Sequence, residues 1–329
     1  MSWLPRVILA WALALGWPFL SESFMAKWIS NALLLIIIIA VTDRLTAAPQ
    51  KLVFVSQGQS FVSDLKTLQK QQISKGAAIN HMPKWSPDGT KIVYLSESTT
   101  ISGLGTLVVA APDGRQIGEY PIPTRTATGT VVAGMRAVER IGWFDDSGIF
   151  ASGSVNPYSE EYRIINTQSG QVEHGFIGTK FSTCGRSGVV AFWDPVFPPS
   201  KSMSLEISTS KAPVFIVRDV GSLPTLNIPL EWDEQCKYVA FIEGRTPQEL
   251  VVIGRDGSKV QMKLPSGTTS SVSATQDGYL IGNDRSLYYD SKSARLMPTP
   301  GNVLETTRIQ AEQHRHAVSV LDATEADWW

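Results

Sequence analysis

Short apolar runs separated by tight polar turns recur along the chain from Lys51 onward. The clearest example is "WSPDGTKIVY" at 85–94, in which a tryptophan, a Ser-Pro-Asp-Gly turn and an apolar arm follow one another. Pro87 presets a φ of about −65°, Asp88 can accept hydrogen bonds from its own turn, and Gly89 tolerates the positive φ that closes it. Since the flanking residues are aromatic and β-branched, this segment is predicted to be a β-hairpin.

The hairpin repeats along the chain. Further copies, the first and third of them without gaps, lie at 143–152, 181–192, 232–241 and 274–282. Trp85, Trp143 and Trp232 therefore occupy one repeating position, with anchors about 40 to 58 residues apart. A second apolar hairpin lies between successive anchors, so each unit supplies four strands. This period and strand number are typical of β-propeller blades. The repeating tryptophans are interpreted as packing neighbouring blades together, because a ligand platform would need their rings at a surface.

The repeat resembles that of TolB-like β-propellers. The similarity rests on Trp-Ser-Pro-Asp-Gly, the following Ile-Val-Tyr strand and "LVVAAPDG" at 107–114, and it covers roughly residues 51–300. It implies a six-bladed periplasmic propeller. TolB itself carries an α/β domain before its propeller, and here only an apolar segment precedes Lys51. A shared fold does not imply a shared role in the Tol system.

One blade has to be completed from both ends of the chain. First strands are expected near 82–86, 139–143, 178–182, 229–232 and 270–274. "KLVFVS" at 51–56 is a second strand with no first strand before it, so its partner should come from 302–309 or 316–321, which would remove the open sheet edge. We therefore predict an all-β fold: a single propeller over residues 49–321, with five or seven blades as alternatives to six, and a free tail at 322–329.

Two uncharged apolar runs of 15 residues each, 7–21 and 28–42, precede the propeller. Each is short for a membrane span, which needs about 20 residues. The second run follows Met25-Ala26-Lys27 and precedes the small residues of "TAAP", as in a signal peptide. Residues 1–48 are predicted to be a signal peptide or hydrophobic export segment that contacts the membrane, with Met25 a candidate start. The alternative is an uncleaved anchor. The protein is expected to be periplasmic or secreted, or membrane-anchored if uncleaved.

Long loops should gather on one face of the propeller. In a four-stranded blade, the turns between strands 1 and 2 and between strands 3 and 4 share one face, and the 2–3 loops and blade connections share the other. Nearly all the long insertions belong to the second face, namely 97–104, 121–138, 154–160, 194–212 and 243–248. Loops on a rigid scaffold often carry binding residues. The predicted contacts with a partner are Met135, Arg136, Tyr158, Phe197, Pro198 and Pro199, unless these loops are merely tolerated insertions.

Two tryptophans end the acidic C-terminal segment. Trp328 and Trp329 either dock into a partner, for which Trp is a favoured anchor, or fold back onto the propeller.

Cys184 and Cys236 are the only cysteines, and both lie in 1–2 turns of adjacent blades. An exported protein can keep a disulfide, but Cα atoms more than about 7 Å apart cannot be bridged without movement. Both outcomes are open.

Catalytic motifs are absent from the sequence. It has no nucleophile elbow, phosphate-binding loop or zinc cysteine pair. "HRH" at 314–316 would place two imidazoles on one side of a strand, but nothing marks a third ligand. No metal and no cofactor are predicted. The formal net charge of −1 gives no basic domain for nucleic acid.

Two functions remain. The first is a non-enzymatic, exported propeller that binds another envelope protein through its long loops. The second is a propeller lyase or hydrolase that acts on a saccharide or peptide at the central channel. Carboxylates, His or Arg converging at the channel mouth would favour the enzyme, and an apolar or uncharged polar lining would favour the binder.

Overall fold

The structure is a computed structural model that describes residues 51–97, 104–122, 134–156, 159–194, 204–209, 213–217, 228–243, 248–266, 268, 271–275, 277–282 and 284–328. The chain divides into Met1–Ala48 and Pro49–Trp329. The predicted export segment lies outside the described residues. Within the described part of the chain, no helix is long and apolar enough to cross a membrane.

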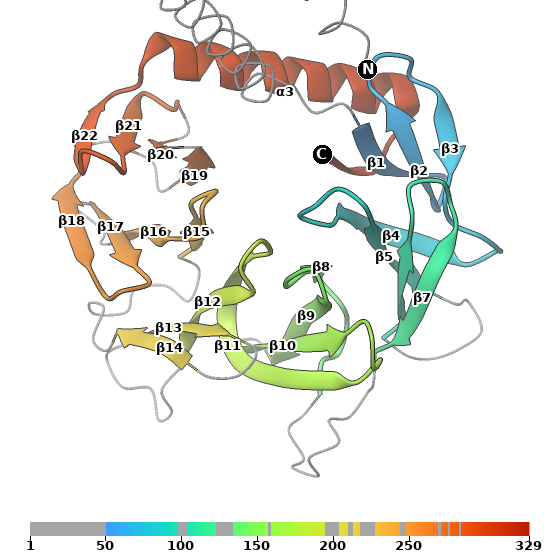
Figure 1. Ribbon diagram of the computed structural model, residues 1–329. Helices are drawn as coiled ribbons and strands as arrows, with labels where there is room; N and C mark the ends of the chain where they lie inside the picture. The colour runs from blue at the N-terminus through green and yellow to red at the C-terminus, as the bar shows by residue number, and fades with distance from the viewer. Residues whose placement is uncertain are drawn as a thin grey trace, which may run out of the picture. The chain divides into compact units, whose positions relative to one another are not determined.

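Antiparallel sheets follow one another in chain order around a common axis (Figure 1). The first contains β23 (Glu325–Trp328), β1 (Lys51–Ser56), β2 (Gln59–Asp64) and β3 (Lys70–Gln72); the second β4 (Ile79–Trp85), β5 (Ile92–Glu97), β6 (Thr106–Ala110) and β7 (Gln116–Pro121). The next is seven-stranded: β8 (Arg140–Trp143), β9 (Gly148–Asn156), β10 (Ser159–Asn166), β11 (Val172–Cys184), β12 (Val189–Asp194), β13 (Ser204–Thr209) and β14 (Pro213–Val217). The last two are β15 (Glu231–Trp232), β16 (Tyr238–Glu243), β17 (Glu249–Gly254) and β18 (Lys259–Lys263), then β19 (Val272–Thr275), β20 (Gly278–Ile281), β21 (Leu287–Asp290) and β22 (Arg295–Pro298).

The long strand β11 belongs to two units. It pairs with β10 up to Gly178 and with β12 from Thr179, with a register shift between Thr179 and Ser182. Lys180, inside this shift, has a φ of 53°. If β11 is divided there, the described strands form six four-stranded groups, which we number blades 1 to 6 in the order just given. The prediction of an all-β propeller is confirmed by this topology.

The C-terminal strand β23 is the innermost strand of blade 1. It pairs antiparallel with β1, with Trp328 opposite Leu52 and Asp327 opposite Val53. The predicted closing segments 302–309 and 316–321 are wrong, because both lie in the helix α3 (Gly301–Leu321). The prediction of a free tail at 322–329 is wrong too, since 325–328 is the closing strand. Apolar positions three or four residues apart, among good helix formers, explain why 301–321 is helical.

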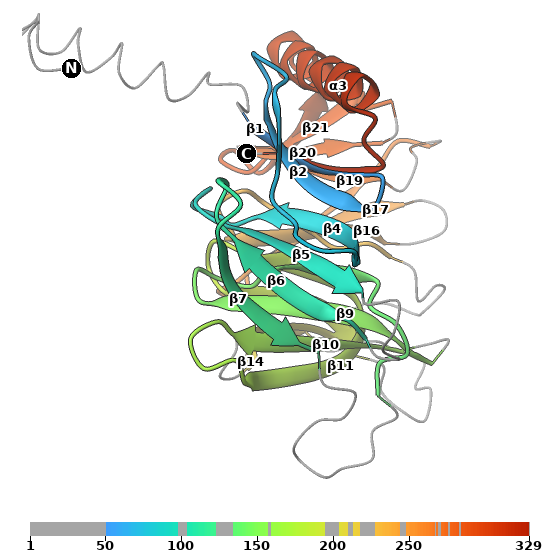
Figure 2. The same ribbon diagram turned by 90° about the vertical axis from the view of Figure 1, so that its right-hand side faces the viewer.

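Buried side chains join neighbouring blades. Five clusters of the described residues lie between blades 1 and 2, 2 and 3, 3 and 4, 4 and 5, and 5 and 6. Alternate residues of a strand face opposite sides, so Val53 packs toward blade 2 whereas Leu52 and Phe54 face the other way. Ala317 and Leu321 of α3 cover that second side. Among the described residues, no cluster joins blade 6 to blade 1, and α3 runs across this sector from β22 toward β1 (Figures 1 and 2).

The repeating tryptophans lie in the cores between blades. Trp85, Trp143 and Trp232 are all buried. The Trp143 indole donates to the Lys84 carbonyl at 3.2 Å, and the Trp232 indole donates to the Ser182 carbonyl at 2.9 Å. Each of these two indoles therefore binds the inner strand of the preceding blade, which sets the spacing of the inner strands around the axis.

The turn after Trp85 has the expected local chemistry. Asp88 Oδ1 accepts hydrogen bonds from the Ser86 hydroxyl at 2.6 Å and from the Thr90 N–H at 3.0 Å. The Ser86 bond is the main cause that lowers the pKa of Asp88, with the Thr90 bonds adding to it. Gly89 has a φ of 67°, a conformation that glycine adopts without steric cost. The turn thus holds β4 and β5 in register.

Candidate functional site: an axial cavity

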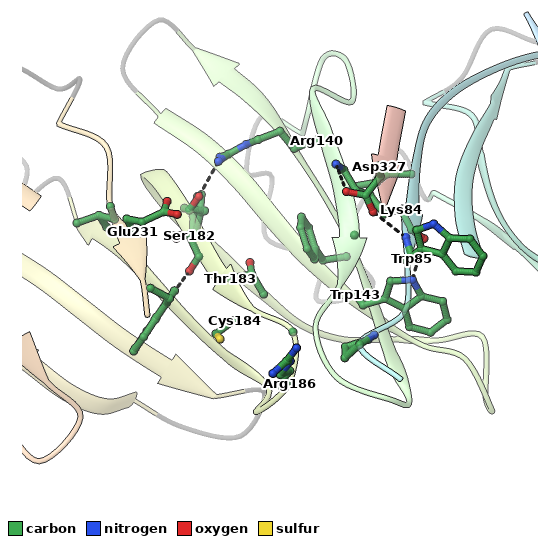
Figure 3. Close-up of a pocket in the computed structure, with 18 of the residues that line it drawn as sticks. Lys84, Trp85, Arg140, Trp143, Ser182, Thr183, Cys184, Arg186, Glu231 and Asp327 are labelled. Atoms are coloured by element: carbon green, nitrogen blue, oxygen red, sulfur yellow. Dashed lines mark hydrogen bonds and ion pairs between the residues drawn. The ribbon is translucent and has the colours of Figure 1, made fainter. Parts of the chain in front are cut away.

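A cavity of about 760 Å³ lies against the inner strands and is the candidate site. Its walls come from β23, β4, β8, the end of β11 and β15, together with parts of the 1–2 turns of blades 2, 4 and 5 (Figure 3). The charged residues in these walls are Lys84, Arg140, Arg186, Glu231, Asp233, Glu234 and Asp327. The volume is within the range of small-ligand sites, roughly 300 to 1,000 Å³.

One register position recurs in every inner strand, and we call it the inner-ring position. It is defined by pairing with the second strand of the blade and is occupied, from blade 1 to blade 6, by Asp327, Lys84, Gly142, Ser182, Glu231 and Ser273. The next residue along each strand is, in the same order, Trp328, Trp85, Trp143, Thr183, Trp232 and Ala274. Trp328 therefore stands in the repeating tryptophan position rather than in a docking tail.

Two carboxylates of β23 hold the closing strand to β4. Asp327 Oδ1 lies 3.1 Å from the Lys84 ammonium, and its Oδ2 accepts the Trp85 N–H at 2.9 Å. Glu325, two residues earlier on the same face, accepts the Met82 N–H and lies 3.4 Å from His81 Nδ1. The backbone of β1 and these side-chain contacts to β4 together fix the closing strand.

Arg140 and an aromatic group form the wall on blade 3. The Arg140 guanidinium donates to the Phe181 carbonyl at 2.6 Å and to Glu160. Tyr162 stacks with Phe150 and with Phe181, with ring centroids 4.7 and 5.0 Å apart. The side of the wall on blade 3 is therefore apolar beneath a guanidinium that already has two protein partners.

Glu231 on blade 5 is the most distinctive charge of the cavity. Burial raises the pKa of its half-buried carboxyl, and the nearby backbone N–H of Ala274 acts in the opposite direction without cancelling this effect. Within the described part of the chain, Glu231 forms no ion pair. Its neighbour Asp233 is different, because it accepts the N–H groups of Lys237 and Tyr238 at 2.7 and 2.9 Å and so serves its own turn.

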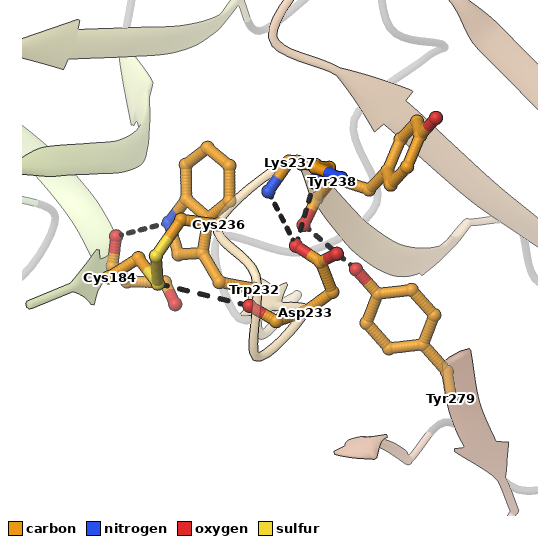
Figure 4. The surroundings of a disulfide bond; sticks show 8 residues. Cys184, Trp232, Asp233, Cys236, Lys237, Tyr238 and Tyr279 are labelled. Carbon is orange, nitrogen blue, oxygen red and sulfur yellow. Dashed lines mark hydrogen bonds between the residues drawn. A yellow bond between two sulfur atoms is a disulfide. The ribbon is translucent and has the colours of Figure 1, made fainter. Parts of the chain in front are cut away.

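A disulfide joins the two walls that come from blades 4 and 5. Cys184 and Cys236 have Cα atoms 5.7 Å apart (Figure 4), within the range that a disulfide can span. Cys236 has a φ of 57°, and the Trp232 indole bonds Ser182 beside it. Inner strands this close at the axis bring the two turns within reach of each other.

The charged lining meets the criterion that would favour an enzyme. Most of these charges, however, already bind protein groups: Lys84 binds Asp327, Arg140 binds Glu160, and Asp233 binds its own turn. Among the described residues, Arg186, Glu231 and Glu234 are the cavity charges that neither form an ion pair nor bind the backbone of their own turn. In the same part of the chain, no three His, Cys, Asp or Glu residues lie close enough together to hold a metal ion.

The predicted contact residues are only partly described. Met135 is 5% exposed, packs in the core between blades 2 and 3, and donates its N–H to Glu161 at 2.9 Å. Its prediction as a contact is therefore wrong, because the chain has entered the core by residue 135. Arg136 is exposed. Five predicted contacts lie outside the described residues: Tyr158, Phe197, Pro198, Pro199 and Trp329. The side chain of Trp328 is likewise not described.

His314 and His316 lie in α3 and not on one side of a strand. Residues two apart on a helix point in different directions, so the geometry considered for a metal pair is wrong. Asp327 is a cavity residue that the sequence analysis does not predict, because it falls within the predicted tail at 322–329. The signal was present, since Trp328 continues the repeating tryptophan and places Asp327 one residue before it.

No family model matches the sequence, and no curated protein matches it. Among solved structures, the chain is similar to the tricorn protease, with a TM-score of 0.50 and 12% identity over 76% of this chain and 29% of that chain. It is also similar to the β-propeller domain of the Trilobed protease from Pyrococcus furiosus, with a TM-score of 0.46 and 12% identity over 77% and 82% of the two chains. The chain thus spans under a third of the tricorn protease, and likeness at this identity concerns the fold alone. Fold and cavity define the class as a β-propeller protein; the resemblance to TolB-like propellers stays a prediction.

Proposed function

We propose that this chain is an exported, non-enzymatic β-propeller that binds another protein of the cell envelope. One observation carries the proposal: four of the seven charged side chains of the axial cavity, Lys84, Arg140, Asp233 and Asp327, already bind protein groups, and the other three face its interior or the solvent. Charges committed to protein partners are unsuited to proton transfer, whereas Arg186 and Glu234 in exposed turns suit contact with a partner. The long loops predicted for the other face of the propeller, with the exposed Arg136 next to one of them, are the second proposed contact area.

Site-specific photo-cross-linking in the full chain tests this proposal. A photoreactive residue is placed at Arg136 on the loop face, at Arg186 at the cavity mouth, and at Lys66, an exposed turn residue of blade 1, as the control. A single protein adduct formed from Arg136 or Arg186 and absent from Lys66 is the expected result. Adducts from none of the three positions, or equal adducts from all three, would refute the binding role.

Export is tested separately by fractionation. The chain is expected in the periplasm or medium, or with the membrane if residues 1–48 stay attached, and N-terminal sequencing shows which. Recovery in the cytoplasm alone would contradict this part of the proposal.

A lyase or hydrolase at the cavity is the second candidate. The observation that favours it is the presence of Arg140, Arg186 and Glu231 in one cavity, with the pKa of Glu231 raised by burial as expected of a general acid. Screening oligosaccharide and peptide mixtures for new products, with Glu231→Gln as the control, tests this candidate. Turnover by the wild type that the variant loses would establish an enzyme.

A further inference from the structure

Asp327 and Lys84 show how a carboxylate at the inner-ring position is satisfied. Asp327 of blade 1 accepts the backbone N–H of Trp85 in blade 2, at 2.9 Å. The residue just before that N–H is Lys84, which holds the inner-ring position of blade 2 and places its ammonium 3.1 Å from the same carboxylate. One backbone donor and one side-chain cation therefore share one carboxylate across a blade boundary.

Blades 5 and 6 repeat this arrangement without the cation. β15 lies against β19, and Glu231 of blade 5 faces the backbone N–H of Ala274 in blade 6, which acts to lower the Glu231 pKa. The residue just before that N–H is Ser273, which stands in the register position of Lys84. Ser273 is exposed, so space exists beside the carboxylate, but its hydroxyl carries no charge.

The burial of Glu231 supports the comparison between the Glu231 and Asp327 carboxylates. Desolvation raises the pKa of Glu231, and no cation of the described residues acts against it. A partly buried carboxylate without a countercharge is costly, and an ammonium or guanidinium that arrives from outside recovers that cost through charge-assisted hydrogen bonds. Glu231 lines the cavity (Figure 3), so such a group has a route to it.

We propose that Glu231 binds the cationic end of a lysine or arginine side chain of the partner, in the place that the Lys84 ammonium takes beside Asp327. This inference rests on the proposed binding role and names the chemical group that the cavity recognises. The cavity of about 760 Å³ accommodates such a side chain together with neighbouring residues of an extended peptide.

Binding of a defined probe tests the inference without knowledge of the partner. The probe is an acetylated, amidated pentapeptide with one central lysine, and the same peptide with acetyl-lysine is its neutral match. Calorimetry on the full chain should show affinity at least about tenfold higher for the lysine peptide, the scale of one charge-assisted hydrogen bond. Glu231→Gln should remove this preference, whereas Glu119→Gln, the same charge change at an exposed residue outside the cavity, should keep it.

A second variant tests the register argument. Ser273→Lys should place an ammonium beside Glu231, raise the melting temperature and reduce binding of the lysine peptide about tenfold, because the site is already filled. Ser273→Met, of similar length and without charge, should do neither. In a Glu231→Gln background, the stabilisation by Ser273→Lys should disappear.

Three outcomes of the peptide and variant experiments overturn the inference. They are equal affinity for the two peptides, an unchanged preference in Glu231→Gln, and a Ser273→Lys effect that is the same with Glu231 and with Gln. Butylamine binding as tightly as the peptide would also overturn it, because the site would then belong to small amines. If photo-cross-linking still captures the partner through Arg136 in Glu231→Gln, the binding role stands while this inference fails.

Discussion

Replacing Asp327 should weaken the closing strand much more than replacing its partner Lys84. The ion pair joins side chains that are 42% exposed for Lys84 and 26% for Asp327, and pairs this exposed contribute about 0.2 to 1 kcal/mol. The bond from the Trp85 N–H at 2.9 Å is a partly buried hydrogen bond to a charged group, which contributes about 1.5 to 3 kcal/mol. Asp327→Ala loses both and should cost about 2 to 4 kcal/mol. Lys84→Met loses only the first.

Urea denaturation at pH 7, at low and at high salt, separates the two contributions. Salt screens the exposed ion pair, because the Debye length falls roughly threefold between 0.1 M and 1 M salt. The destabilisation by Lys84→Met should therefore shrink in 1 M salt, whereas most of the destabilisation by Asp327→Ala should remain. Asp327→Asn keeps an oxygen that can accept the Trp85 N–H and should fall between the two. Equal losses for Asp327→Ala and Lys84→Met would refute the role given to the backbone bond.

Three further predictions concern the wall formed by blades 4 and 5. Trp232→Phe leaves the Ser182 carbonyl without its indole donor and should lower the free energy of unfolding by about 1 to 2 kcal/mol, measured by urea denaturation; no change would show that this bond is dispensable. Because the folded state raises the pKa of Glu231 above 4.5, the ionised group is penalised, so Glu231→Gln should raise the melting temperature at pH 7. That gain should vanish as the pH falls through the folded-state pKa toward 4.5; a gain independent of pH would contradict it. Replacing both Cys184 and Cys236 by Ser should cost about 4 kcal/mol for a sequence separation of 52, by comparison with the oxidised wild type; equal stabilities would contradict the crosslink.

The inner strands could be predicted from the sequence because their signal is local. Trp85 precedes a turn whose Pro, Asp and Gly each have a conformational reason to be there. The same pattern, a tryptophan followed by a turn, begins at Trp143 and at Trp232 and predicted strands at 139–143 and 229–232, where the structure has β8 and β15. The looser copy at 181–192 also predicted a first strand at 178–182, which falls within β11 (Val172–Cys184). Local turn chemistry and a repeating aromatic are thus enough to set the register of these blades.

The closure and the cavity could not be predicted in the same way. The strand Glu325–Trp328 has only four residues, and its Glu, Ala and Asp are poor strand formers, so only the register of Trp328 reveals it. Asp327 and Lys84 are 243 residues apart in the chain, and their contact depends on how the first and last strands meet. The search for a longer apolar strand led instead to 302–309 and 316–321, whose spacing of three and four residues is helical.

The helix α3 explains why the closing strand depends on side chains as well as on β pairing. Of its 21 residues only Ala317 and Leu321 are buried, a smaller apolar contact than the clusters that join the other neighbouring blades among the described residues. Its C-terminal end is held by the Lys70 ammonium on the Leu321 carbonyl at 2.6 Å, and the chain then meets β1 where the Thr324 N–H bonds the Val55 carbonyl at 2.8 Å. Since little apolar surface ties blade 1 to this helix, the chain relies on a short strand whose carboxylates bind β4, and Asp327 therefore serves both ring closure and the wall of the cavity.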